Sequence, residues 1–434
     1  MKSLLRKYVM KLLGLGILGF LIANLPWCEY VNAVSTTPAW KPSELIMNSS
    51  YDNQRGDRFL AFDHYGVPSV VTITTTGAVS FARQVDGVGW KNRTIGGVNA
   101  KHASLAFDRR ELPGISFGAD NGLNYSYFST TTGTFLTNLV DNTAVTGRQW
   151  TLGTAVAFDL YGRPAMAATR NDGNFGDLFY ISDTNRDGVL SSADLLESVT
   201  TDPESFPSLT FDRQNRPIIA PRYLSQGIFG DLDVWMKDPF TGWGLSVVST
   251  NAEEGTPDAV TGSIAIDPTD GLPAVAWTHV ISANNSQLWY GKWNQLQSQW
   301  DLTLVTNNPT SEMGSESLAF DPGDGRPAIS YGDKTGNVNF AWFNGTSWMT
   351  QVVTNTSTAF APRTSLAFNE YGHGFPAIAY ITNSGAGTGQ LRFVVDPPIA
   401  VPEPSTFVLI PLAIVALGGN IRSRRVCRQT LLIS

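Results

Sequence analysis

The stretch SLAFDPGDGRPAISY, residues 317–331, decides the fold, because versions of it occur seven times along the 434-residue chain. The six other copies read FLAFDHYGVPSVV, SLAFDRRELPGISF, AVAFDLYGRPAMAA, SLTFDRQNRPIIAP, SIAIDPTDGLPAVAW and SLAFNEYGHGFPAIAY. Their anchor residues, separated by 45, 51, 53, 55, 54 and 48 positions, are Asp63, Asp108, Asp159, Asp212, Asp267, Asp321 and Asn369. Repeats of about this length are typical of propeller blades.

Each copy has the periodicity of β-strands. Leu318 and Phe320 alternate with small residues, a turn containing Asp, Gly and Pro follows, and a second short apolar run comes next. A third apolar segment such as VNFAWF and a fourth segment that often opens with Trp complete the unit. Four strands in each of seven units predict an all-β, seven-bladed β-propeller over residues 34–396.

The ends of the array predict how the ring closes. The seventh unit reaches Pro397 without a fourth strand. The segment WKPSELIMNSS, which begins at Trp40, has the pattern of a fourth strand and precedes the first unit. We therefore expect the N-terminal strand to complete the last blade, which would remove the exposed sheet edges of an open array.

The repeated Asp is predicted to be structural. An Asp at the end of a strand can accept hydrogen bonds from backbone N–H groups two or three residues further on, and the following Pro directs the chain into the next strand. The seventh copy has Asn369, which keeps the acceptor oxygen without the charge. The repeated Trp residues are likewise predicted to pack between blades rather than to stack on sugars. The motif resembles one found in many exported bacterial propellers, which implies this fold but no particular activity.

One segment has the spacing of a calcium loop. In DTNRDGVLSSAD, oxygen ligands fall at Asp183, Asn185, Asp187, the Val189 carbonyl, Ser191 and Asp194, with Gly188 at the position of the sharp turn. The segment resembles an EF-hand loop, and more closely a dockerin-type loop, but it has no second copy. We predict one structural Ca²⁺ here, in a link between the third and fourth strands; the alternative is an ordinary solvated turn.

The N-terminus predicts export. Residues 1–33 contain four basic residues, the apolar run LLGLGILGFLIANL and a small-residue cleavage site at VNA. A lipoprotein anchor at Cys28 is the alternative, although the bulky Pro26 and Trp27 before it argue against that. Cys427 is the only other cysteine, so a chain processed at both ends would have no disulfide and no thiolate metal site.

The C-terminus predicts a sorting signal. Residues 397–404 form a Pro-rich linker, and residues 405–434 hold an apolar run too short for an ordinary spanning helix, followed by an Arg cluster. VPEPS at Val401–Ser405 and the order of these parts resemble the PEP-CTERM signal. The resemblance implies processing by an exosortase, transient anchoring by this helix, and delivery to the cell surface or an exopolysaccharide matrix. A plain C-terminal membrane anchor is the alternative.

The net charge of the processed chain indicates which kinds of binding partner are favoured. Residues 1–33 and 405–434 hold eight basic residues and one acidic residue, so removing them changes the net charge from −7 to −14. This balance disfavours nucleic acid and favours cations as partners. It also suits an exported protein that needs only to stay soluble.

The sequence favours binding over catalysis. Three adjacent links between units are acidic and contain Asp202 and Glu204, then Glu253, Glu254 and Asp258, then Glu312 and Glu316. Paired carboxylates can hydrolyse glycosides when they lie about 5 to 10 Å apart, but no His pair, nucleophile elbow or phosphate loop accompanies them. We expect a non-enzymatic surface or matrix module that binds envelope polysaccharide or other surface proteins. The alternative is a secreted carbohydrate-active hydrolase or lyase.

Overall fold

The computed structural model describes residues 38–396 except 53, 55–57, 143–148, 151–152, 172–175, 201–203, 224–231, 250–261, 283–284, 309–312, 359, 370–373 and 386. All of them belong to one unit, Met1–Pro397. The predicted export signal (1–33), linker (397–404) and C-terminal segment (405–434) lie outside the described residues. Among the residues that are described, no helix is long and apolar enough to cross a membrane.

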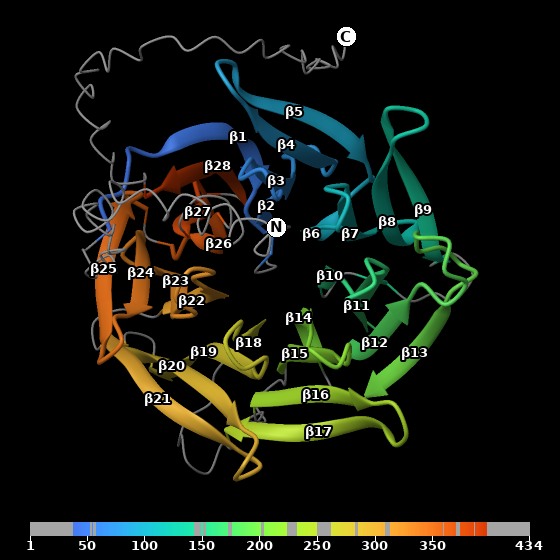
Figure 1. Cartoon of the computed structure of the whole chain (residues 1–434). Helices are drawn as coiled ribbons and strands as arrows, with labels where there is room; N and C mark the ends of the chain where they lie inside the picture. The colour runs from blue at the N-terminus through green and yellow to red at the C-terminus, as the bar shows by residue number, and fades with distance from the viewer. Residues whose placement is uncertain are drawn as a thin grey trace, which may run out of the picture. The chain divides into compact units, whose positions relative to one another are not determined.

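The described residues form seven four-stranded antiparallel sheets, arranged around a centre as the blades of a propeller (Figure 1). Blades 1 and 2 consist of β2 (Leu60–Phe62), β3 (Pro68–Ile73), β4 (Val79–Val85), β5 (Gly89–Gly96), β6 (Lys101–Phe107), β7 (Pro113–Ala119), β8 (Gly122–Ser129) and β9 (Thr134–Asn142). Blades 3 and 4 consist of β10 (Thr154–Phe158), β11 (Pro164–Asn171), β12 (Gly176–Ser182), β13 (Leu195–Thr200), β14 (Glu204–Phe211), β15 (Pro217–Tyr223), β16 (Leu232–Asp238) and β17 (Gly242–Ser249).

Blades 5 and 6 consist of β18 (Gly262–Ile266), β19 (Pro273–Ser282), β20 (Asn285–Asn294), β21 (Gln299–Asn308), β22 (Met313–Phe320), β23 (Pro327–Asp333), β24 (Asn337–Phe343) and β25 (Trp348–Asn355). Blade 7 consists of β26 (Arg363–Asn369), β27 (Phe375–Ile381), β28 (Thr388–Val395) and β1 (Glu44–Ser50). The quoted repeat is the inner strand and second strand of each blade, with the turn between them. The all-β, seven-bladed prediction is confirmed.

Strand β1 closes the ring as predicted. It pairs antiparallel with β28, from Glu44 opposite Phe393 to Ser50 opposite Thr388, with an irregularity between Leu45 and Met47. The two strands lie side by side in Figure 1 although they come from opposite ends of the domain. Every strand that the structure describes therefore lies between Trp40 and Asp396, and these strands complete the ring.

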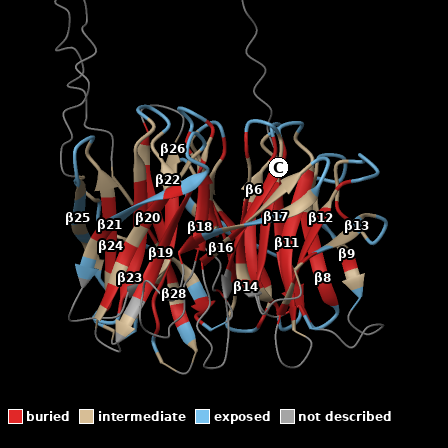
Figure 2. Ribbon diagram, turned by 90° about the horizontal axis from the view of Figure 1, so that it is seen from below, coloured by how far each residue is buried: buried red, intermediate tan, exposed pale blue. Residues whose placement is uncertain are grey.

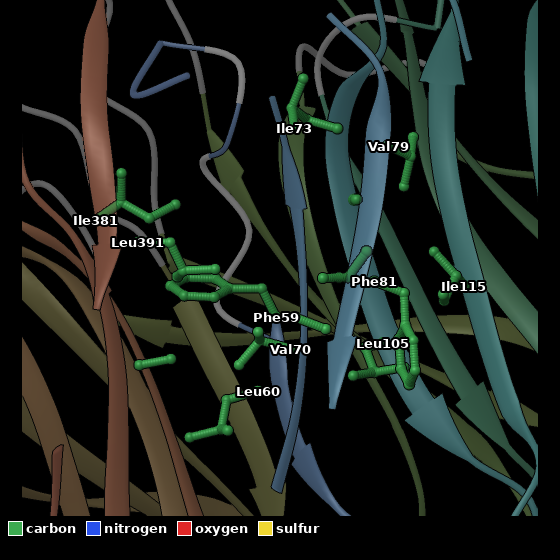
Figure 3. Close-up of a cluster of buried hydrophobic side chains, with 14 of the residues drawn as sticks. Phe59, Leu60, Val70, Ile73, Val79, Phe81, Leu105, Ile115, Ile381 and Leu391 are labelled. Carbon is green, nitrogen blue, oxygen red and sulfur yellow. The ribbon is translucent and has the colours of Figure 1, made fainter. Parts of the chain in front are cut away.

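The hydrophobic core is a series of layers between neighbouring blades. Figure 2 shows buried residues along the strands and exposed residues mainly in the turns at their ends. The largest layer joins blade 7 to blades 1 and 2, with Leu391, Val70 and Ile115 among its fully buried side chains (Figure 3). The alternation of large and small residues in the repeat supplies these layers, because successive side chains of a strand point to opposite faces of its blade.

The Ser of the repeat links five of the seven blades to the next blade. Ser365 Oγ accepts hydrogen bonds from the backbone N–H groups of Phe59 and Leu60, both at 3.1 Å. The same bond joins other neighbouring blades through Ser104, Ser208, Ser263 and Ser317. Blade 1 has Phe59 and blade 3 has Ala155 at this position. A small buried hydroxyl thus connects adjacent inner strands without occupying much of the core.

The fourth-strand Trp residues pack against the preceding blade, as predicted. Trp90 lies 5.1 Å from Phe393, and Trp348 lies 5.2 Å from Tyr290, measured between ring centroids. Trp40, which precedes the closing strand, lies 5.1 Å from Phe340. These rings hold the outer edges of the blades together rather than forming an exposed platform.

Candidate functional site

The repeated Asp closes the turn that follows each inner strand. Asp159 Oδ1 accepts the backbone N–H groups of Tyr161 and Arg163 at 2.8 and 2.9 Å. Equivalent bonds are made by Asp63, Asp108, Asp212, Asp267 and Asp321. The structural interpretation of these six residues is confirmed. In the seventh turn, the Asn369 side chain lies beside the turn of blade 1, 3.5 Å from the Gly66 carbonyl oxygen.

We call the surface formed by these seven turns the turn face. Among its described residues, each turn has one with positive φ, at Gly66, Glu111, Gly162, Asn215, Gly271, Gly325 and Gly374. At the two positions that are not Gly, the side chain reaches the preceding turn: Glu111 accepts the His64 N–H at 2.6 Å, and Asn215 accepts the Leu160 N–H at 2.6 Å. The positive φ is unfavourable for these residues, but their side chains tie neighbouring turns together.

Cations neutralise most of the turn carboxylates. The ion pairs are Arg83 with Asp63, Arg110 with Asp108, Arg163 with Asp159, Arg216 with Asp212, and Lys292 with Asp267. Burial acts to raise the pKa of Asp267, but hydrogen bonds from Lys292 and Thr269 outweigh it, so the pKa lies below its usual value. Asp321 forms no ion pair with any described residue, and burial raises its pKa despite the hydrogen bond from Gly323.

The predicted calcium loop is the link between β12 and β13. It carries all six predicted ligands, Asp183, Asn185, Asp187, Val189, Ser191 and Asp194, and it replaces the short turn found here in other blades. Its first residue lies at the turn face, because the Asp183 N–H donates to the Pro164 carbonyl oxygen at 3.2 Å. The location predicted from the sequence is therefore confirmed, whereas metal binding stays a prediction.

The carboxylates of this link bind its own backbone. Asp183 accepts the N–H groups of Asp187 and Gly188 at 3.2 and 2.9 Å, and Asp194 accepts the Thr184 N–H at 3.0 Å. Gly188 has a φ of +84°, as the predicted sharp turn requires. The donor set is all oxygen, which suits Ca²⁺, although no three His, Cys, Asp or Glu side chains gather as a metal cluster within the described ranges.

A pocket of about 340 Å³ lies beside this link, between blades 3 and 4. We call it the blade 3–4 pocket. Its polar lining comes from the link, from the turns of both blades and from the third strands, and comprises Asp159, Arg163, Tyr180, Ser182, Asp183, Thr184, Arg186, Asn215 and Lys237. Pro164, Ala165, Phe211 and Pro217 form its apolar part. This volume is within the range of about 300–1,000 Å³ that is usual for small-molecule sites.

A second pocket, of about 550 Å³, lies at the turn-face end of the central channel. Apolar residues at the ends of five inner strands line it, namely Phe62, Phe107, Ile266, Phe320 and Phe368. Three of its polar side chains already have partners: Glu111 contacts the His64 ring at 3.0 Å, and the Arg58 guanidinium donates to the Ile264 carbonyl oxygen on the opposite side. This pocket is therefore an apolar rim around a channel crossed by Arg58.

The acidic links do not form a described catalytic pair. Asp202, Glu253, Glu254, Asp258 and Glu312 lie outside the described residues, as does the side chain of Glu204. Glu316 lies in strand β22 rather than in a link, is 2% exposed and accepts a hydrogen bond from Thr278 Oγ1 at 3.1 Å. Thr364, at the position of blade 7 that corresponds to Glu316, also contacts the second strand of the preceding blade, through Ser330, so Glu316 occupies a structural position between blades.

The blade 3–4 pocket was not predicted from the sequence. Tyr180 and Lys237 belong to different blades, and no local motif connects them. The one sequence signal for it was the length of the link after Ser182, because a long link beside two short turns can form one side of a pocket. Its size and lining depend on how two blades pack.

Comparison with known proteins gives neither a family nor a curated relative. No family model matches the chain, and no curated protein matches it. Among solved structures, the Dos1 propeller has 13% identity, covering 77% of this chain and 76% of that one, with a TM-score of 0.45.

Two similar structures belong to enzymes. A polysaccharide lyase of family PL25, an ulvan lyase, has 10% identity over 71% of this chain and 80% of its own, with a TM-score of 0.47. The NanB sialidase of Streptococcus pneumoniae has 12% identity over 85% and 72%, with a TM-score of 0.43. At these identities and scores, the similarities carry no argument about what this chain binds or does.

Proposed function

We propose that this protein is a surface or matrix module that binds envelope polysaccharide and does not turn it over. The observation that supports the proposal is the blade 3–4 pocket, which offers hydrogen-bonding groups and an aromatic side chain in one hollow. Its two carboxylates, on Asp159 and Asp183, are held by backbone N–H groups. A carboxylate whose oxygens already accept hydrogen bonds from the backbone is a poor general acid or base. The pocket therefore suits binding better than hydrolysis.

A glycan array tests the proposal on residues 34–396, since the ring is complete within them. We expect binding to a subset of glycans with no turnover in a parallel glycosidase and lyase screen. Turnover that disappears when the acidic-link carboxylates are neutralised would instead establish the alternative, a secreted hydrolase or lyase. Binding of no glycan and no surface polysaccharide would contradict the proposed function.

We also propose that the link from Asp183 to Asp194 binds one structural Ca²⁺. Its oxygen ligands would come from the six predicted residues, and the ion would offset the charge of three carboxylates in one short link. In that role Ca²⁺ stiffens blade 3 and takes no part in chemistry. The supporting observations are the all-oxygen donor set and the sharp turn at Gly188.

Calorimetric titration of Ca²⁺ tests this second proposal. We expect one site in the wild-type protein, a melting temperature that rises with Ca²⁺, and loss of both effects in Asp187→Ala. Asp301→Ala, which changes a carboxylate on the outer strand β21, is the matched control and should keep the site. If Asp187→Ala and the wild type have equal Ca²⁺ affinity and equal melting temperature, the proposed calcium site is wrong.

A third proposal concerns the location of the protein in the cell. We infer export, processing near Val401–Ser405 by an exosortase-type enzyme, and delivery to the cell surface or matrix, with membrane attachment only before processing. The support is the order of sequence features at the two ends. Mass spectrometry of the protein recovered from the cell surface should find a start near residue 34 and an end near residue 404. Recovery of an uncut C-terminus from membranes would favour a plain anchor.

A further inference from the structure

We propose that the blade 3–4 pocket binds the anionic group of an acidic sugar, a carboxylate or a sulfate ester, and that Arg186 and Lys237 are its main contacts. This inference rests on the proposed glycan-binding function and names the ligand class and the residues. It is carried by a property of the pocket: both carboxylates accept hydrogen bonds from the protein, whereas the three cations keep N–H groups that no described residue uses.

The two carboxylates of the pocket are held by hydrogen bonds within the protein. Asp159 Oδ1 takes the backbone N–H groups of Tyr161 and Arg163, while Oδ2 takes the Arg163 guanidinium at 2.7 Å and the Asn215 amide at 3.3 Å. An ionised carboxylate has about four acceptor sites, so Asp159 has none left for a ligand. Asp183 is 3% exposed and accepts bonds from two loop amides.

The donors are in excess. Lys237 Nζ donates to Glu197 at 2.5 Å and has three N–H groups in all. The Arg163 guanidinium has five N–H groups, and Asp159 takes only part of them. Arg186 is exposed and makes no ion pair or hydrogen bond with any residue that the structure describes. A ligand that meets these groups must bring acceptors, and a carboxylate or sulfate is the strongest acceptor a sugar can carry.

The walls of the pocket favour a sugar over a bare ion. Tyr180 lies under Lys237, whose Nζ is 5.5 Å from the ring centroid, and next to Trp243 at 5.3 Å. Burial raises the pKa of Tyr180, so the phenol stays uncharged beside an anion. The apolar part of the lining can contact the carbon face of one sugar ring while the cations hold its charged group.

The charge of the whole domain limits how acidic the glycan can be. The lining has three cations, Arg163, Arg186 and Lys237, against two carboxylates, whereas residues 34–404 carry a net charge of −14. A continuous polyanion would be repelled outside the pocket. We therefore infer an isolated acidic residue in an otherwise neutral glycan, bound as a side group or chain end.

Calorimetry with three matched oligosaccharides tests the inference on residues 34–396. The ligands are one that ends in a uronic acid, one that ends in a sulfated sugar, and the first with its carboxylate reduced to an alcohol. We expect at least one acidic ligand to bind and the reduced one to bind at least tenfold more weakly. The two acidic ligands decide whether carboxylate or sulfate is preferred.

Substitutions then locate the site. The double variant Arg186→Gln, Lys237→Gln should weaken the acidic ligand at least tenfold and leave the weak binding of the reduced ligand unchanged. Lys91→Gln, which removes an exposed charge from the outer strand β5 of blade 1, is the matched control and should change nothing. Because Arg186 is exposed, the single variant Arg186→Gln keeps the fold and serves if the double variant melts early.

The outcomes separate this inference from the proposed function. Glycan binding that is equal for acidic and reduced ligands, or unchanged in both variants, would overturn the inference and leave the glycan-binding function standing. If no oligosaccharide binds, the polysaccharide function fails; inorganic sulfate binding that depends on Arg186 and Lys237 would then support the anion pocket alone. Absence of that binding would overturn both.

Discussion

Ser365 shows how a single small side chain joins two blades. It is fully buried, and its oxygen is shared by two backbone N–H groups of the next inner strand. Buried backbone N–H groups that lose their partner cost more free energy than a hydrogen bond contributes on average. The repeat therefore carries Ser at this position because it is the smallest side chain with an acceptor.

Replacing this Ser should destabilise the ring. We expect Ser365→Ala to lower the free energy of unfolding by about 1–3 kcal/mol, because the N–H groups of Phe59 and Leu60 lose a shared acceptor in a buried site. Urea unfolding followed by circular dichroism measures the change. Thr131→Ala, in an exposed turn of blade 2, is the control and should stay within about 0.5 kcal/mol of the wild type. Equal midpoints for both variants would show that the bond contributes nothing.

Two turn carboxylates should respond oppositely to pH. The pKa of Asp267 is lowered in the fold, so its contribution to stability is complete above about pH 3.8, its usual value, and is lost as the pH falls through the lowered value. The pKa of Asp321 is raised, so its ionisation destabilises the fold as the pH rises above about 3.8 through the raised value. Burial acts to raise the pKa of both residues. Hydrogen bonds from Lys292 and Thr269 outweigh it at Asp267, whereas Asp321 forms no ion pair among the described residues.

Substitution by Asn separates the two cases. Asp267→Asn should cost about 1.5 kcal/mol at pH 7, a low value for a charged hydrogen bond because Lys292 is partly exposed. Asp321→Asn should cost less or nothing at pH 7, since it keeps an acceptor oxygen, as Asn369 does in the seventh copy. Thermal melts between pH 3 and pH 7 give both curves. A larger loss at pH 7 in Asp321→Asn would contradict the assignment.

At the scale of elements, the crossing from one blade to the next requires close backbone contact. A Cβ added to Gly332 in β23 would lie 2.2 Å from the Pro362 carbonyl oxygen, where the chain enters blade 7. Gly118 in β7 has the same relation to Trp150 at the entrance to blade 3. These two Gly residues let the connecting segment lie directly on the second strand of the preceding blade.

Gly332→Ala should therefore displace the entrance to blade 7. We expect a loss of about 1–3 kcal/mol, typical of overpacking, because a backbone carbonyl cannot rotate away as a side chain can. Gly244→Ala on the outer strand β17 is the matched control, since its nearest backbone atom would lie 3.8 Å away. Differential scanning calorimetry compares the two variants. Equal melting temperatures would show that the segment at Pro362 can shift without loss of stability.

The elements were predictable because their signals are local. Strand, turn and next strand fall within about 15 residues of each copy, and Asp321 binds a backbone group only two residues further on. The position of the link from Asp183 followed from the same order of strands. The Ser contacts between blades and the blade 3–4 pocket were not predicted, because they join residues about 50 or more positions apart whose relative placement depends on blade packing. Glu316 was assigned to a link, although it lies inside β22.

For the whole molecule, stability depends on closing the ring. Strand β1 supplies the outer edge of blade 7, and Tyr51 next to it donates a hydrogen bond to the Ala361 carbonyl oxygen at 2.6 Å, at the entrance to the same blade. Without β1, the edge of β28 would be unpaired and exposed. The last blade would also lose the Trp40 ring that covers Phe340.

Deletion of residues 39–50 should destabilise all seven blades rather than the last one alone. We expect loss of the single cooperative melt and increased aggregation, because an open ring exposes a sheet edge and two blade faces. Deletion of residues 34–37 is the control and should leave the melt unchanged. A cooperative melt at the wild-type temperature after deletion of residues 39–50 would show that closure is not needed.

The pairing of β1 with β28 also sets an order of events. Glu44 and Phe393 are neighbours in space but about 350 residues apart in sequence. Strand β1 therefore cannot pair until β28 has been synthesised. Contacts of such high sequence separation form late and slowly. During synthesis, the growing sheet array has two unpaired ends that can pair with strands of other chains. A chaperone that covers these ends, or rapid delivery of the complete chain, would therefore raise the yield of folded protein more than any added stability within a blade.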